Sequence, residues 1–134
     1  MDKETYDALA KARLERAKEL LDESKTLLES DKYKSANNRA FYAIEKSIKS
    51  LLASKEIDAD SHIGCLRQFN VHFIKDGEGG FGSGDYKRVA EAQRIRNNSD
   101  YDDFYVADKQ ECSRQVQTAE EFVIKAAKYL NIEL

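Results

Sequence analysis

The sequence predicts an all-α protein, folded as an up-and-down bundle of four to five helices. Apolar residues recur every three or four positions through most of the chain, and charged residues between them make up 35% of the composition. Proline is absent, although average usage would place about 6 or 7 in a chain of this length. Because proline breaks helix interiors, its absence favours long helices without kinks.

The first two helices are predicted as an antiparallel pair. In the first, apolar side chains spaced by three or four residues run from Tyr6 to Leu28. The second starts after Asp31, which is positioned to cap it, and continues to about Ser54. Since only a few residues join the two, we expect them to pack side by side.

The rest of the chain completes the bundle. A shorter apolar segment from Ile63 to Ile74 is predicted as a third helix, although its Val-His-Phe-Ile end also fits a strand. Residues 76–85 hold five of the 6 glycines and predict a flexible loop within a single domain that covers residues 1–134. A fourth helix is expected from about Asp85 to Asn98, and a fifth from Cys112 to Leu130.

Composition narrows the classes of function. A length of 134 residues suits one domain, and a net charge of -3 argues against a long phosphate-tracking surface while leaving room for a small site. No apolar run is long enough for a membrane span or a signal peptide, so we expect no membrane association and a cytoplasmic protein. Cys65 and Cys112 are expected to be reduced, buried thiols.

Two motifs are set aside. The glycine loop lacks the Gly-Lys-Ser/Thr ending of a phosphate-binding loop and carries acidic residues, so a mobile surface loop is the preferred interpretation. His62 and Cys65 are three residues apart, but a structural zinc needs four ligands, and only His72 and Cys112 remain to complete a set. We therefore expect no metal and no cofactor, with buried cysteines and exposed histidines.

The first unusual stretch is Asn37-Asn38-Arg39 inside the second helix. Asparagine prefers caps and turns, so two in succession inside a helix require a reason. One interpretation is a polar network inside the bundle, in which Arg39 binds a carboxylate or a phosphate. The other is that Asn38 and Arg39 face solvent, and the sequence leaves both open.

The second unusual stretch ends the fourth helix. It carries a basic side followed by aromatic residues: Lys87, Arg88, Arg94 and Arg96, then Tyr101, Phe104 and Tyr105. Cations bind phosphate and aromatic rings stack on bases, so this pattern fits a small nucleotide or single-stranded site. Arg96 and Asp100 are also one helical turn apart, which fits an ordinary ion pair.

Together the two stretches resemble the HEPN domain superfamily, in particular its small stand-alone UPF0332-type members. The matching residues are Asn38 to Ala43 with Lys46, Leu51 and Leu52, then His62, Phe69, His72 and Phe73, then Arg96 with Asp100 to Asp102. The resemblance implies a helical bundle that forms a homodimer with the polar segments of both subunits in one cleft. Many members are metal-independent endoribonucleases that act as toxins beside a nucleotidyltransferase antitoxin.

The family's catalytic motif is an arginine followed, after four to six residues, by a histidine. Here the resemblance places the motif arginine at Arg96 and its following polar residue at Asn97, while Tyr101 stands at the histidine position. Tyrosine is a poorer proton acceptor than imidazole at neutral pH, so this departure weakens the case for catalysis.

Three functional hypotheses follow. The first is a weakly active or non-enzymatic HEPN homodimer that binds a nucleotide, RNA or a nucleotidyltransferase-type partner through a cleft that holds Asn38, Arg39, Arg96, Asn97, Asp100 and Tyr101. The second is a metal-independent endoribonuclease toxin with Arg96 as phosphate clamp and Tyr101 or Asp100 in place of the histidine. The third is a non-catalytic helical interaction module whose polar cluster is structural.

Overall fold

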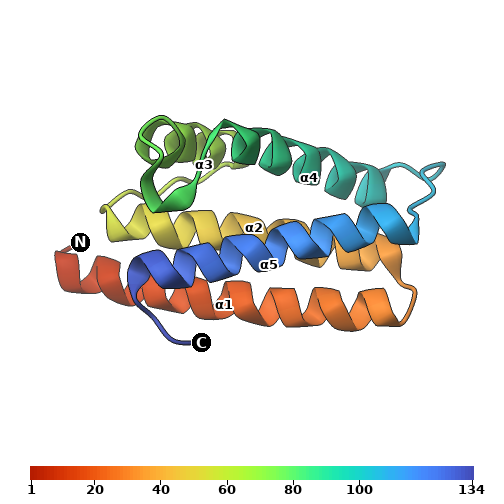
Figure 1. Ribbon diagram of the computed structural model, residues 1–134, viewed down its shortest axis with the longest axis horizontal. Helices are drawn as coiled ribbons and strands as arrows, with labels where there is room; N and C mark the ends of the chain where they lie inside the picture. The colour runs from red at the N-terminus through yellow and green to blue at the C-terminus, as the bar shows by residue number, and fades with distance from the viewer.

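The N-terminal pair of helices is present as predicted. α1 (Lys3–Glu29) and α2 (Tyr33–Ser54) are joined by a short turn and pack antiparallel (Figure 1). The computed structural model describes residues 1–134, with three further α-helices, α3 (His62–Phe69), α4 (Ser83–Tyr101) and α5 (Lys109–Leu130), and no strand. The all-α fold class is confirmed, with five α-helices in the bundle.

Helix α2 lies at the centre of the bundle and contacts each of the other four α-helices. In Figure 1, α1 runs along one side of α2, and α3 and α4 lie on the opposite side. Buried side chains occur on almost every face of α2, among them Ala36, Phe41, Ile48 and Leu52. Because α2 is covered on most of its faces, polar side chains such as Asn37 and Glu45 lie inside the protein.

The beginning of α2 corrects one prediction, because Asp31 does not cap this helix. Its N-cap is Lys32, which makes no side-chain cap bond, and Asp31 instead adopts a left-handed φ of 59°. The N–H of Asp31 donates to Leu28 O and that of Lys32 to Leu27 O, which closes the last turn of α1. Aspartate tolerates the left-handed conformation that this closure needs, so Asp31 ends α1 rather than starting α2.

The third predicted helix is present but changes its geometry partway. α3 ends at Phe69, and Asn70–Ile74 forms one turn of π-helix rather than a strand. The wider turn lets Phe69, Phe73 and Ile74 all be buried in the core. Edge-to-face packing of Phe69 against Phe81, with ring centroids 5.1 Å apart, joins this segment to the glycine-rich loop.

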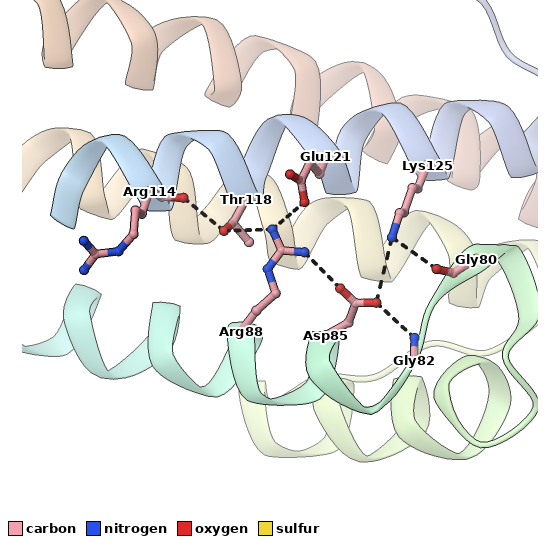
Figure 2. Close-up of polar contacts among 8 residues, drawn as sticks. All are labelled: Gly80, Gly82, Asp85, Arg88, Arg114, Thr118, Glu121 and Lys125. Atoms are coloured by element: carbon pink, nitrogen blue, oxygen red, sulfur yellow. Dashed lines mark hydrogen bonds and ion pairs between the residues drawn. The ribbon is translucent and has the colours of Figure 1, made fainter. Parts of the chain in front are cut away.

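The glycine-rich loop is held at several points. Phe81 is buried in the core, and Glu78 accepts hydrogen bonds from Lys55 and from the Tyr129 hydroxyl. Figure 2 shows Lys125 of α5 donating to Gly80 O, and Asp85 of α4 accepting from the Gly82 N–H. A carboxylate of the chain therefore already occupies a backbone N–H that a phosphate-binding loop would offer.

Helix α4 is longer than predicted at its carboxyl end. It continues to Tyr101 instead of ending near Asn98, so Ser99, Asp100 and Tyr101 are helical. Two hydrogen bonds from α2 hold this last turn, one to Ser99 and one to Asp100. Since these partners are 62 residues away in sequence, no local pattern indicates that the helix continues.

The remaining predictions concern membranes and cysteines. No helix combines the length and apolar character needed to span a bilayer. Both cysteines are buried free thiols, as predicted. Burial raises the pKa of Cys65 to about 12 and that of Cys112 to about 11.

These raised pKa values predict that both thiols resist a thiol-specific disulfide reagent in the folded protein. At about pH 8 the thiolate fraction of Cys112 is about one in a thousand, and the thiolate is the reactive form. We expect slow labelling in buffer and rapid labelling of both cysteines in denaturing urea, followed by absorbance. Rapid reaction of either thiol without denaturant contradicts the prediction.

Candidate functional site

One polar site lies between α2, α4 and the first residue of α3. Helix α2 contributes Asn38, Tyr42 and Glu45, which share a face because they are spaced by four and three residues. Helix α4 contributes Arg96, Asp100 and Tyr101, and α3 contributes His62. We call these seven residues the α2–α4 site.

Arg96 is the centre of the site. Only 5% of its surface is exposed, and its guanidinium carbon lies 5.1 Å from the ring centre of Phe41, 5.3 Å from that of Tyr42 and 5.7 Å from that of Tyr101. Its Nη1 is 3.5 Å from the Asp100 carboxylate, while its Nε has no hydrogen-bond partner. The cation is thus stabilised by aromatic faces and one carboxylate, with a donor left unused.

His62 lies next to Arg96, although the sequence spacing gives no hint of it. The His62 Nε2 atom is 3.4 Å from Arg96 Nη2, and the ring packs edge-on against Phe41. Its Nδ1 atom is hydrogen-bonded to the Glu45 carboxylate. The expectation of exposed histidines is therefore wrong: His62 is half-buried in the site, and His72 is half-buried beside Gln68.

Glu45 fixes the orientation of the His62 ring. Glu45 is buried, and besides His62 its carboxylate pairs with Lys49 at 3.7 Å. An ionised carboxylate can only accept a hydrogen bond, so the network assigns the proton of a neutral His62 ring to Nδ1, which donates to Glu45. Nε2 is then an acceptor that faces Arg96. One signal in the sequence points to Glu45, because it lies between Ile44 and Ile48 and follows Phe41 by one helical turn, close to the apolar side of the helix.

The two asparagines of α2 both hydrogen-bond to the last turn of α4, Asn37 in the interior and Asn38 nearer the surface. Asn37 is only 2% exposed and donates to the Ser99 hydroxyl at 3.1 Å. Asn38 donates to Asp100 at 2.9 Å and accepts from Arg39 at 2.6 Å. A chain of polar contacts thus runs from Arg39 through Asn38 and Asp100 to Arg96, but its outer part lies at the surface: the Arg39 side chain is 41% exposed, and of the two asparagines only Asn37 is inside the bundle.

The other residues proposed from the sequence lie at the margin of the site. Arg39 does not reach Arg96 directly, and its Nε lies 3.5 Å from Glu23 of α1. Asn97 is exposed and its side chain makes no hydrogen bond. Tyr101 is 75% exposed on the last turn of α4, and its hydroxyl accepts from Arg96 Nη1 at 3.5 Å.

The arrangement combines three chemical capabilities at one place. Arg96 offers positive charge, His62 offers an imidazole nitrogen, and Tyr101 offers an exposed ring and a hydroxyl. Together these groups can bind a phosphate and move a proton. No group of three or more histidine, cysteine or acidic side chains is positioned to hold a metal ion.

Comparison with known proteins assigns this architecture to a family. The family model described as the HEPN domain matches residues 10–129. A protein of Methanocaldococcus jannaschii named "Putative toxin" is 32% identical over 117 residues, which cover 87% of this chain and 78% of that protein. A "UPF0332 protein" of Thermotoga maritima is 32% identical over 109 residues, covering 81% of this chain and 80% of that protein.

The buried asparagine generates a stability prediction. Replacing Asn37 with alanine leaves the Ser99 hydroxyl without its partner and creates a small cavity, so we expect the free energy of unfolding to fall by about 1–3 kcal/mol. Asn97→Ala is the matched control, because that side chain is exposed and unbonded, and a change within about 0.5 kcal/mol is expected. Urea denaturation followed by circular dichroism measures both, and equal losses contradict the prediction.

Proposed function

The chain belongs to the HEPN domain family, and we propose that residues 1–134 act as one domain that binds single-stranded RNA at the α2–α4 site and cleaves it without a metal ion. The observation that supports this proposal is the distance of 3.4 Å between His62 Nε2 and Arg96 Nη2. An imidazole beside a fixed cation supplies the proton acceptor and the phosphate clamp that RNA cleavage needs. His62 thereby fills the role for which the sequence suggested Tyr101 or Asp100.

The proposed reaction is transfer of the phosphoryl group within the RNA. The 2′-hydroxyl attacks the adjacent phosphorus, and His62 Nε2 accepts its proton while Arg96 stabilises the added negative charge on the phosphate oxygens. The bond from phosphorus to the 5′-oxygen breaks, and the Tyr101 hydroxyl donates a proton to that oxygen. The proton held by His62 then passes through water to Tyr101, which restores both groups. The products are a 2′,3′-cyclic phosphate and a 5′-hydroxyl.

Access to Arg96 runs past Tyr101. Phe41 and Tyr42 cover the inner side of the guanidinium, whereas Tyr101 is exposed at the end of α4. An exposed side chain changes rotamer within nanoseconds, so the Tyr101 ring shifts enough to admit the phosphate to Arg96 while its hydroxyl stays beside the leaving 5′-oxygen. Asp100 and Asn38 keep Arg96 in place during this exchange.

We also propose that the protein acts as the toxin of a toxin–antitoxin pair. Relatives named "Putative toxin" support it, and the HEPN resemblance points to a nucleotidyltransferase-type antitoxin as the partner. Binding of a nucleotide or of that partner without cleavage is the alternative function for the same site. The acidic segment after α4, with Asp102, Asp103 and Asp108, favours a protein partner over a long nucleic acid for this neighbouring surface.

Cleavage is tested with purified protein and single-stranded RNA in the presence of EDTA. We expect products with 2′,3′-cyclic phosphate ends, and a loss of about 100-fold or more in rate for His62→Ala, because the proton acceptor is removed. His72→Ala is the matched control, since that ring lies on the π-helical turn and bonds to Gln68. Thermal unfolding of each variant establishes that it is folded.

Two outcomes contradict the catalytic proposal. One is wild-type protein that cleaves no RNA at high enzyme concentration. The other is cleavage that His62→Ala and His72→Ala reduce equally. In either case titration with RNA and with nucleoside monophosphates decides whether the binding function remains.

We also propose a homodimer that covers the exposed apolar residues beside the site. Phe104 is 94% exposed, so pairing of two copies through this ring would bury apolar surface while leaving Tyr101 accessible to RNA. Light scattering is expected to give twice 15.3 kDa for the wild type. Phe104→Asp is expected to shift the mass toward one chain, whereas Ile124→Asp on the outer face of α5 is the control. A single 15.3 kDa species at micromolar concentration contradicts the dimer.

A further inference from the structure

We propose that the groove between α3 and α4 is a subsite for one nucleobase of the RNA, next to the phosphate held at the α2–α4 site. This proposal rests on the proposed function, and it specifies that the groove recognises one base of the RNA substrate. The groove is a pocket of about 250 Å³ lined by Ile63, Leu66, Arg67, Asn70, Tyr86 and Gln93. We call it the α3–α4 groove.

The polar side chains of the α3–α4 groove are free to bind a ligand. Arg67, Asn70, Tyr86 and Gln93 make no side-chain hydrogen bond or ion pair with any other part of the chain. No carboxylate lines the groove, in a protein whose net charge is -3. The groove therefore offers a cation and two amides without a competing acidic group of the chain.

The α3–α4 groove lies next to the α2–α4 site. Gln93 precedes Arg96 by one turn of α4, and Ile63 follows His62 directly in α3. Leu66 and Gln93 also line the small cavity that contains Glu45 and His62. A nucleotide whose phosphate contacts Arg96 and His62 can thus place its base, or that of its neighbour, in the groove.

The lining suits a base better than a whole nucleotide or a metabolite. A volume of about 250 Å³ is below the range of about 300–1,000 Å³ typical of complete small-molecule sites. Tyr86 is 40% exposed and Ile63 is 69% exposed, so an aromatic ring and an apolar surface are available for a base to stack on. Amide side chains such as Asn70 and Gln93 bind base edges through paired donor and acceptor atoms.

The comparable pocket between α4 and α5 lacks these features. It contains Arg88 and Arg114, but Arg88 is engaged by Asp85, Thr118 and Glu121, as Figure 2 shows. Arg114 has no side-chain partner, but the carboxylates of Glu91 and Glu121 line the same pocket and compete with an anionic ligand, whereas no carboxylate lines the α3–α4 groove. Compared with this pocket, the α3–α4 groove is better suited to an anionic external ligand.

Binding of labelled RNA hexanucleotides tests the subsite. The probes are the A, C and U hexamers with 2′-O-methyl groups, which block cleavage, and anisotropy measures their affinity. We expect Tyr86→Ala to weaken binding of the preferred hexamer by about five-fold or more, because a stacking surface is lost. Tyr86→Phe keeps the ring and is expected to bind as the wild type does.

A second variant tests reading of the base rather than stacking. Asn70→Ala is expected to bring the affinities for the three hexamers closer together, because an amide that distinguishes base edges is removed. Urea denaturation of each variant checks that the fold is unchanged.

The outcomes separate the subsite from the function on which it rests. If the wild type binds the hexamers and both Tyr86→Ala and Asn70→Ala match it, the subsite is overturned while RNA binding at the α2–α4 site stands. If the wild type binds none of the hexamers, the proposed RNA function fails and the subsite with it.

Discussion

The burial of one cation, Arg96, is the constraint on which the arrangement of this protein depends. A guanidinium that is 95% covered loses most of its contact with water, and only aromatic faces, a carboxylate and neighbouring polar atoms stabilise it there. The last turn of α4 must remain helical to bring Asp100 beside it. Helix α2 must present Phe41 and Tyr42 on the other side. The relative position of the two helices follows from these requirements.

The same constraint explains the polar character of a helix that is otherwise enclosed by apolar neighbours. Asn37 and Asn38 hydrogen-bond to Ser99 and Asp100, so α2 holds the turn that carries the partner of Arg96. Glu45 is buried about two turns farther along α2 and hydrogen-bonds to His62. In a poorly hydrated interior each of these polar groups is costly without its partner, so the partners fix one another's positions. A rigid site and a stable helix packing are here consequences of the same contacts.

The fold was more predictable than the site. The period of apolar residues indicated the five helices, because each helix buries one face whatever its partners are. Errors occurred where a segment's role depended on its neighbours. Asp31 completes α1 by donating its N–H to Leu28 O at the turn, and the π-helical turn after Phe69 exists because the core takes up Phe73 and Ile74. The extension of α4 to Tyr101 depends on bonds from α2.

The sequence by itself determined the helices and the contacts within one turn of a helix, such as the pair Arg96 and Asp100. It also indicated that Asn37 and Asn38 need a polar environment, because asparagine is a poor choice inside a helix. Only the tertiary structure decided that His62 belongs with Arg96, 34 residues away, and with Glu45, 17 residues away. The physical reason is that helical spacing fixes which residues share a face, while the packing of α3 against α2 and α4 decides which faces meet.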